Sequence, residues 1–221
     1  MINTFFNLGI IAAAWPILLR GFGATLLLSA ITVPLGCIAG LLLALGSTIR
    51  HPWVRWPLMV WVDFFRALPP LVLLIFIYAG LPFAGLRLGA YGCVALGFFL
   101  NTGAYYGEIL RAGIESVPNG QVEAARSTGL SRLQALAFVV LPQAVRAVLP
   151  DLLSNTVEVV KLTSIASVVA LPELLYEARQ AQSVTYNPTP IVAAAVLYFL
   201  LLWPAVRLLS RLQNQAIAGR G

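Results

Sequence analysis

The sequence predicts an all-α integral membrane protein with about five transmembrane helices, its N-terminus outside the cytoplasm and its C-terminus inside. Of the 221 residues, 60% are hydrophobic and 10% are charged, against roughly 25% charged in a soluble domain. Uncharged runs of roughly 20 or more residues are long enough to cross a hydrocarbon layer of about 30 Å. Arginines collect in alternate connections between these runs. We therefore expect one transmembrane domain over residues 1–221.

The first and third expected spans are uncharged runs. The first covers residues 21–46, which at about 1.5 Å per residue reach about 39 Å, enough to span with some tilt. The third covers residues 88–110, where Glu108 and Arg111 end the uncharged run. Because Arg20 is the only basic residue in the first segment and no small-residue cleavage site follows, we expect no removable signal peptide.

The second expected span, residues 57–81, carries charge. Asp63 and Arg66 are three residues apart on one helical face, where they can pair and lower the cost of burial. Pro69 and Pro70 interrupt the helix. We therefore expect a broken span.

The fourth and fifth expected spans flank an amphipathic segment. The fourth, residues 134–160, contains charged residues and should face protein or water more than lipid. Residues 163–183 are too polar in their second half to span, which indicates an interfacial or re-entrant helix on the periplasmic side. The fifth span covers residues 184–207, and basic residues follow it directly.

The arginines fix the expected orientation, because basic residues favour the cytoplasmic side. The two sides of the expected topology collect the following residues: Arg50, Arg55, Arg111, Arg126, Arg132, Arg207, Arg211 and Arg220 on one, and Arg20, Arg87 and Arg179 on the other. The richer side includes the connection 111–133, which is therefore expected in the cytoplasm.

The connection 111–133 predicts two short helices. A turn at residues 118–120 ends the preceding helix, and Asn119 or Gly120 is expected to cap a new one. Glu123 is then expected in its first turn, where a carboxylate suits the helix dipole. Ala124 and Ala125 have little bulk, so another protein can approach that face closely.

The end of this connection carries two further signals. Gly129 is placed to stop the first short helix. Ser131, with Gln134 three residues later, can form a capping box for the following span. The residues alone fit both a solvated connector and a rigid helical hairpin at the membrane surface.

The spacing of this loop resembles a known signature. Glu123-Ala124-Ala125, then Gly129, then Val139-x-Leu141-Pro142, is similar to the cytoplasmic EAA motif of bacterial ATP-binding-cassette importer permeases. The resemblance implies that the loop is a coupling helix seated in a cleft of the ATPase subunit. It gives Glu123, Ala124, Ala125 and Gly129 a role in ATPase docking.

Three further stretches resemble the branch of these permeases that imports polar amino acids such as histidine, glutamine, arginine or opines. They are FFRALPPLVLLIFIYAGLP at 64–82, AYYGEILRAGIESVPNGQ at 104–121 and LPQAVRAVLPDLLSN at 141–155. One departure occurs at residues 161–165, where Lys-Leu-Thr-Ser-Ile replaces the branch's frequent Lys-Asp-Thr-Ser-Leu. No role of that aspartate can be transferred to this chain.

Polar residues inside spans are candidates for a substrate pathway or for structural contacts between helices. Asn155, Glu158 and Lys161 are three residues apart on one face, and a zwitterion needs a partner for its ammonium and another for its carboxylate. Glu158 and Lys161 can also neutralise each other. Thr163 belongs to the same candidate pathway. Asp63 and Arg66, close to the end of a span, rank lower.

The resemblance also implies partners. These are an ATP-binding-cassette ATPase dimer that binds ATP and magnesium, a second permease subunit (identical or paralogous), a periplasmic solute-binding protein and the lipid bilayer of the bacterial inner membrane. The chain itself has no phosphate-binding G-x-x-x-x-G-K-[ST] motif, so we expect no cofactor, metal or catalytic site in it. Scattered basic residues argue against nucleic acid.

Two other classes compete with this interpretation. A secondary transporter commonly contains internal repeats, and the expected spans show no self-similar halves. A membrane enzyme lacks support because His51 is the only histidine and no metal-spaced cluster occurs. Separately, the glycine pairs 36/40 and 103/107 allow close helix packing, which we expect within a permease dimer.

Overall fold

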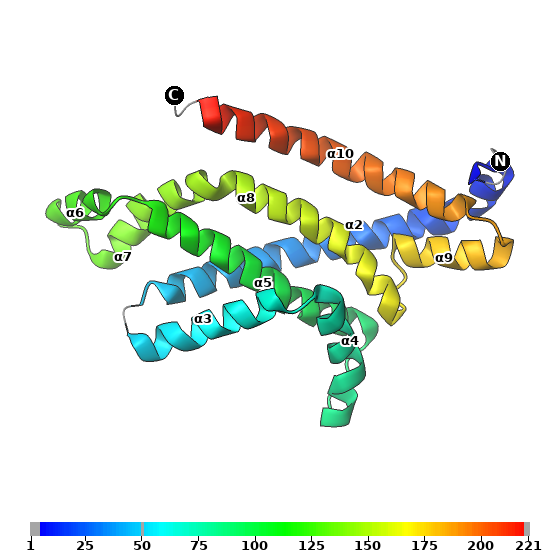
Figure 1. Cartoon of the computed structure of the whole chain (residues 1–221), viewed down its shortest axis with the longest axis horizontal. Coiled ribbons are helices and arrows are strands. Elements are labelled where there is room, and N and C mark those ends of the chain that lie inside the picture. Colours follow the sequence, from blue (N-terminus) through cyan, green and yellow to red (C-terminus); the bar gives the residue numbers. More distant parts are fainter. Residues whose placement is uncertain (1–4, 50, 219–221) are drawn as a thin grey trace. The chain divides into compact units, whose positions relative to one another are not determined.

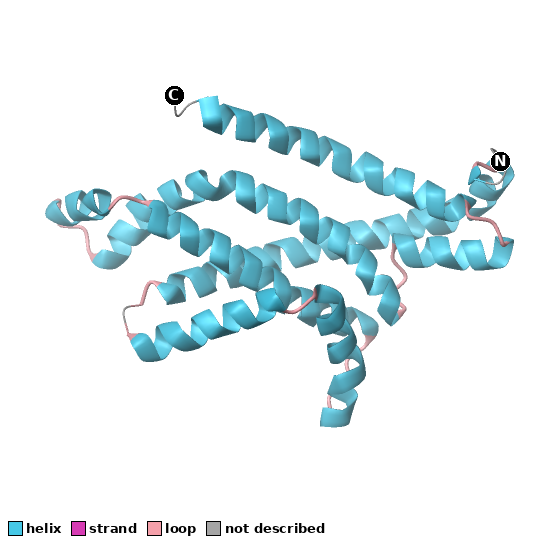
Figure 2. Cartoon of the chain, viewed as in Figure 1, coloured by secondary structure: helices cyan, strands magenta, loops and turns pink. Residues whose placement is uncertain are grey.

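The computed structural model describes residues 5–49 and 51–218, with side chains described as far as Arg211. Throughout this part of the chain, helices are joined by loops and no strand occurs (Figure 2). The chain divides into two compact units: Met1–Pro34, Pro69–Phe98 and Thr156–Gly221 form unit 1, and Leu35–Leu68 and Phe99–Asn155 form unit 2. Helices α2, α5 and α8 each contribute one end to each unit.

Helix α2 (Leu8–Ser47) contains the first expected span and begins well before it. The Asn7 side chain accepts hydrogen bonds from the backbone N–H groups of Gly9 and Ile10, which starts the helix. Its 40 residues correspond to about 60 Å of helix. The helix begins before the expected span at residue 21, because the isolated Arg20, which is exposed, does not end an apolar helix.

The second expected span is broken, as predicted. Helix α3 (Pro52–Ala67) ends where Leu68 adopts an extended conformation, and α4 (Pro70–Gly80) begins after Pro69, which is also extended. A residue before proline is pushed away from the helical region, which explains both extended residues. A short 3₁₀ turn, η1 (Leu81–Ala84), follows α4.

In unit 2 the second half of α2 packs closely against α5 (Ala90–Ser116). A Cβ atom on Gly40 would lie 2.5 Å from the Cβ of Tyr106, and one on Gly103 would lie 2.9 Å from the Cβ of Ala39. The two glycine pairs therefore serve packing within a single chain. The expectation that they pack across a permease dimer was wrong.

The connection after α5 is a helical hairpin in unit 2 (Figure 1). It consists of α6 (Asn119–Ser127) and α7 (Arg132–Ala135), followed by a single π turn, η2 (Leu136–Val140), and α8 (Leu141–Leu162). The Leu141 N–H donates to the Leu136 carbonyl five residues back. Pro142 has no N–H to continue the α-helical pattern, which accounts for the π turn.

Unit 1 contains the last elements: the 3₁₀ turn η3 (Thr163–Val169), α9 (Leu174–Thr185) and α10 (Thr189–Ala218). The core of this unit joins α2, α9 and α10 through Ala14, Leu18, Leu174, Ala178, Ala181 and Ala194. The segment expected as one amphipathic helix over 163–183 is thus a 3₁₀ turn and a separate helix, and α9 buries one face against its neighbours.

Among the described residues, three helical segments are long and apolar enough to cross a membrane: Leu8–Ser47, Arg132–Val169 and Thr189–Arg211. Helices α3 and α4 qualify as a fourth only as a bent pair. Helix α5 has 27 residues but carries buried polar side chains, including Asn101 and Thr102, and does not qualify. The total of five spans and the orientation of the termini stay predictions.

Candidate functional site

The helical hairpin formed by α6 and α7, residues 119–135, differs at its start from the expected geometry. Pro118 is the N-cap residue of α6 and has no capping side chain, so Asn119 and Gly120 already belong to the helix. The expectation that one of these two residues caps the helix was therefore wrong. Glu123 lies beyond the first turn for the same reason, and its expected interaction with the N-terminal end of the helix dipole is absent.

The end of α6 and the start of α7 match the prediction. Gly129 has a φ of +90°, a left-handed conformation that favours glycine and ends the helix. Ser131 and Gln134 form a reciprocal capping box: the Gln134 N–H donates to Ser131 Oγ at 3.2 Å, and the Ser131 N–H donates to Gln134 Oε1 at 2.8 Å. Two locally determined turns therefore hold the hairpin.

The side chains of the hairpin divide into an inner and an outer set. Ala125 is buried, at 7% exposure, and α6 packs against η2. Glu123, Ala124 and Gly129 are exposed. Of the four residues predicted to dock the ATPase, Glu123, Ala124 and Gly129 are therefore accessible, whereas Ala125 packs inward.

An open groove of about 1400 Å³ lies beside the hairpin. It is lined by the end of α5, α6, α7 and η2, with Leu133 (77% exposed) and the basic side chains of Arg126 and Arg132 along it. The groove thus lies next to the residues for which docking is predicted.

An ion-pair ladder connects α3 to the part of α5 that leads into the hairpin. Arg66 contacts Glu108 at 3.7 Å, and Arg111 pairs with Glu108 at 2.7 Å and with Glu115 at 2.6 Å. The predicted pairing of Asp63 with Arg66 was wrong, because Arg66 turns to Glu108 on the neighbouring helix. Glu108 accepts two hydrogen bonds from the Arg111 guanidinium, at 2.8 and 2.7 Å.

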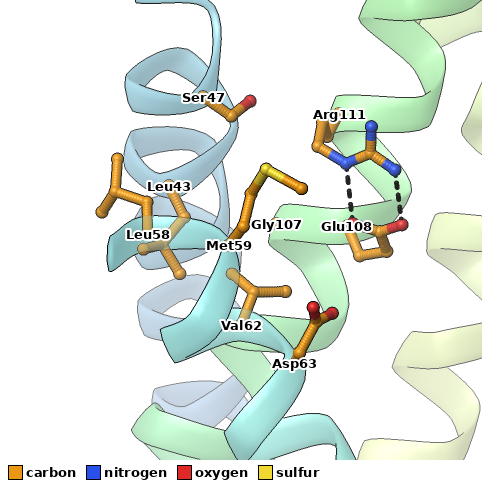
Figure 3. Close-up of a pocket in the computed structure, with 9 residues that line it drawn as sticks. All are labelled: Leu43, Ser47, Leu58, Met59, Val62, Asp63, Gly107, Glu108 and Arg111. Atoms are coloured by element: carbon orange, nitrogen blue, oxygen red, sulfur yellow. Dashed lines mark hydrogen bonds and ion pairs between the residues drawn. The ribbon is translucent and has the colours of Figure 1, made fainter. Parts of the chain in front are cut away.

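Asp63 lines a small cavity in unit 2, shown in Figure 3. The cavity has an empty volume of about 480 Å³ and is bordered by α2, α3 and α5, with Ser47, Glu108 and Arg111 as its other polar residues. Asp63 has no ion pair within the described part of the chain. The substrate role expected for Asp63 and Arg66 stays a prediction.

The polar face of α8 consists of Asp151, Asn155, Glu158 and Lys161. Lys161 Nζ and Glu158 Oε1 are 2.6 Å apart, and their side chains are 47% and 58% exposed. The amide nitrogen of Asn155 is buried and has no hydrogen-bond partner in the described residues. The spacing therefore brings Glu158 and Lys161 together as expected, and it leaves one polar atom of Asn155 unsatisfied.

Thr163 lies apart from this exposed face. It is fully buried, and its hydroxyl donates to the Val160 carbonyl at 2.7 Å. A role in a substrate pathway stays a prediction for this residue, although the structure gives it a packing role in unit 1.

Sequence reasoning did not single out Glu173. This fully buried residue caps α9: its carboxylate oxygens accept hydrogen bonds from the N–H groups of Leu175 at 2.9 Å and Tyr176 at 2.8 Å. The Tyr198 hydroxyl donates to the same carboxylate at 2.8 Å. Burial raises the pKa of Glu173, and these hydrogen bonds and the charge of Arg179 partly oppose the rise.

The sequence offered one signal for this residue. Glu173 follows a proline and directly precedes the helical run of α9, which is the N-cap position. Glutamate is not among the residues preferred there, and no periodicity marks its partner Tyr198, which lies 25 residues further on. Only the packing of α10 onto α9 brings the two side chains together.

Comparison with known proteins gives consistent matches. The profile of the binding-protein-dependent transport system inner membrane component family matches residues 32–218. YckA of Bacillus subtilis (strain 168), a probable amino-acid ABC transporter permease protein, is 37% identical over 174 residues, or 79% of this chain and 77% of YckA. OccM of Rhizobium meliloti, an octopine transport system permease protein, is 36% identical over 206 residues, or 89% of this chain and 84% of OccM.

The fold is also shared with solved transporters. A crystal structure of an amino acid ABC transporter with histidines aligns with a TM-score of 0.84 and 32% identity, over 93% of this chain and 96% of that chain. Together with the family match, the long apolar helices indicate a multi-pass membrane transport protein. The chain belongs to the binding-protein-dependent transport system inner membrane component family, and it is a permease subunit of an importer.

Proposed function

We propose that this permease carries polar amino acids or related compounds, such as opines, in an ATP-driven importer of the bacterial inner membrane. The polar face of α8 carries the proposal, because it exposes Glu158 and Lys161 within a segment that is long and apolar enough to span. A charged side chain facing lipid costs about 2.5–3.5 kcal/mol or more. Such a face belongs against water or protein.

The chemistry of this face suits a zwitterion. In the ligand-free protein Glu158 and Lys161 neutralise each other across 2.6 Å. A bound amino acid can replace this ion pair with two others, one between its ammonium group and Glu158 and one between its carboxylate and Lys161. Asn155 Nδ2, which lacks a partner in the described residues, adds a donor one turn away. Glu158 favours a cationic ligand, and Lys161 beside it opposes that preference.

The substrate class also agrees with the relatives. The matched proteins are named for amino-acid, octopine and glutamine transport, and the aligned crystal structure is of an amino acid transporter with histidines. Two of them, GlnM and GlnP of Bacillus subtilis (strain 168), are both named as glutamine transporter permeases. We infer that this chain likewise works with a second permease subunit, identical or paralogous, that covers the polar face of α8.

The remaining partners follow from the hairpin and the orientation. With five spans, the N-terminus outside and the C-terminus inside, the hairpin of α6 and α7 lies in the cytoplasm and docks on an ATPase dimer that holds ATP and magnesium. A periplasmic solute-binding protein delivers the ligand on the opposite side. Closure of the ATPase dimer moves two such hairpins together and switches the pathway from outward-facing to inward-facing by a rigid-body change.

The test is co-purification from the native membrane in mild detergent, with Glu123→Arg compared with the wild type. Glu123 is exposed and outside the ion-pair ladder, so the substitution alters the docking surface without disturbing the fold. Mass spectrometry should find an ATPase subunit with the wild type and at least tenfold less with the variant, about 1.4 kcal/mol.

Arg87→Glu is the matched control, because Arg87 is an exposed residue of a different loop. It should retain the ATPase. If the wild type brought down no ATPase under conditions that preserve known importers, the ATP-driven mechanism would be excluded and an ion-coupled transporter would take its place.

A further inference from the structure

The end of α10 carries a stripe of four residues spaced four apart, which places them on one helical face. Phe199 and Trp203 have ring centroids 6.3 Å apart, and the Arg207 guanidinium lies over the Trp203 ring at 5.6 Å. Arg211 continues the stripe by one more turn. The face therefore changes along its length from purely apolar, through an amphipathic ring, to basic.

The basic end of the stripe borders an open cleft. Its empty volume is about 970 Å³, and it is lined by Trp203, Pro204, Arg207, Leu208, Ser210 and Arg211. Trp203 is 50% exposed and Leu208 is 57% exposed. All six residues belong to α10, so the cleft is an open face of this helix on which cationic and apolar side chains lie next to each other.

The two arginines differ from three other basic residues of the chain in having no acidic partner among the described residues. Arg66, Arg111 and Lys161 each contact a glutamate. Within the described part of the chain neither Arg207 nor Arg211 makes an ion pair, and helix α10 contains no Asp or Glu. The positive charge of this cleft is therefore available to an anion.

The position of the stripe along the span identifies the kind of anion. The helix is uncharged from Thr189 to Val206 and Arg207 lies about 27 Å along it, close to the edge of a hydrocarbon layer of about 30 Å. Tryptophan is enriched at the level of the headgroups, and arginine attracts lipid phosphate. A phospholipid matches this order: its acyl chain would lie along Phe199, its glycerol backbone at Trp203 and its phosphate at Arg207 and Arg211.

We propose that the stripe Phe199, Trp203, Arg207 and Arg211 is a binding site for one anionic phospholipid. The apolar part of the stripe distinguishes this ligand from free phosphate, which would use the arginines alone. An acidic protein surface would likewise not need the ring-lined segment inside the span. The inference rests on α10 only and holds whichever solute the permease carries.

The experiment uses the intact transporter in detergent and measures binding of phosphatidylglycerol by native mass spectrometry. Each arginine near an anionic lipid contributes about 1 kcal/mol, or about fivefold in affinity. Arg207→Gln with Arg211→Gln should therefore weaken phosphatidylglycerol about 25-fold and leave phosphatidylcholine unchanged. Arg207→Lys, which keeps the charge, should retain affinity within about threefold.

Arg87→Gln is the control, because Arg87 is exposed but lies outside the stripe. It should bind phosphatidylglycerol as the wild type does. A double arginine variant with wild-type lipid affinity would overturn the proposal. Displacement of the lipid by millimolar inorganic phosphate would also overturn it, because that result indicates a free-phosphate site. Loss of the ATPase subunit from the double variant with lipid binding intact would overturn it too, because that result indicates a protein contact. Trp203→Leu should weaken phosphatidylglycerol and leave phosphate binding unchanged.

Discussion

At the residue scale, Glu173 shows how a membrane protein holds a carboxylate away from water. Three donors satisfy its two oxygens: the N–H groups of Leu175 and Tyr176 and the hydroxyl of Tyr198. The N–H of Leu174 is satisfied separately by Thr25 Oγ1 at 3.2 Å. These bonds join α2, α9 and α10 around one fully buried acid, so its protonation should affect the stability of unit 1.

The raised pKa of Glu173 predicts stability that falls with rising pH. Because burial favours the protonated form, its contribution is fully present below the ordinary carboxyl value of 4.5 and is lost as pH rises through the higher pKa of the folded state. Thermal unfolding in detergent, measured from low to neutral pH, should show this fall. Glu173→Gln should be less stable, because an amide cannot accept all three hydrogen bonds, and its pH slope should be shallower. Equal slopes would contradict the assignment.

The ladder predicts unequal costs for two glutamates. Glu108 contacts two arginines and is 26% exposed, so Glu108→Gln should destabilise the protein by about 1–3 kcal/mol. Glu115 contacts one arginine and is 53% exposed, so Glu115→Gln should cost about 0–1 kcal/mol. Chemical unfolding of the two variants compares them directly. Equal losses would mean that Glu108 does not connect α3 to α5.

At the element scale, the hairpin depends on one backbone conformation. Gly129→Ala should cost about 1–2 kcal/mol, because an alanine in the left-handed region is strained although open space surrounds the site. Gly120→Ala is the matched control within the same hairpin. Its Cβ also meets open space, and alanine favours the helix, so stability should rise slightly. The melting temperatures of the two variants should therefore move in opposite directions, and a Gly129→Ala variant as stable as the wild type would contradict the strain.

The close approach of α2 and α5 predicts a second contrast. A Cβ on Gly40 would lie 2.7 Å from the backbone nitrogen of Gly107, which cannot move aside, so Gly40→Ala should cost about 1–3 kcal/mol. Gly23→Ala, on the same helix, adds a Cβ in open space and should be neutral or stabilising by up to about 1 kcal/mol. Thermal unfolding distinguishes them, and similar values would contradict tight packing at Gly40.

Elements with local causes were predictable. The capping box at Ser131, the stop at Gly129 and the break before Pro70 each depend on neighbours a few residues away. Features decided by tertiary packing were not. The sequence spacing places Asp63 within reach of Arg66, and only the approach of α5 to α3 selects Glu108 instead.

The start of a helix was also poorly predicted where one residue decided it. Pro118 caps α6, which moved Glu123 out of the first turn. Arg20 was taken as a boundary, but its long side chain can reach the polar interface while α2 continues. The two short helices of the connection were thus predicted at the right place along the chain, but the inward position of Ala125 depended on the packing of α6 against η2.

At the scale of the whole molecule, the polar face of α8 must lie against water or protein once the chain is in a membrane. Two arrangements satisfy this requirement. In one, Glu158 and Lys161 line the pathway and bind the ligand; in the other, they form a neutral pair in the contact with the second permease. Because the exchange keeps a neutral pair at the same two positions, and an exposed pair contributes only about 0–1 kcal/mol, the fold of the chain should stay as stable as in the wild type.

The exchange Glu158→Lys with Lys161→Glu therefore separates the two arrangements. We expect uptake of arginine and glutamine by the reconstituted transporter to fall at least tenfold, because the ligand's ammonium and carboxylate then meet charges in reversed positions. The melting temperature and recovery of the ATPase should match the wild type, which excludes misfolding. Wild-type uptake by the exchanged variant would assign the pair to the contact between permeases, and the substrate pathway would then have to be sought on another helix face.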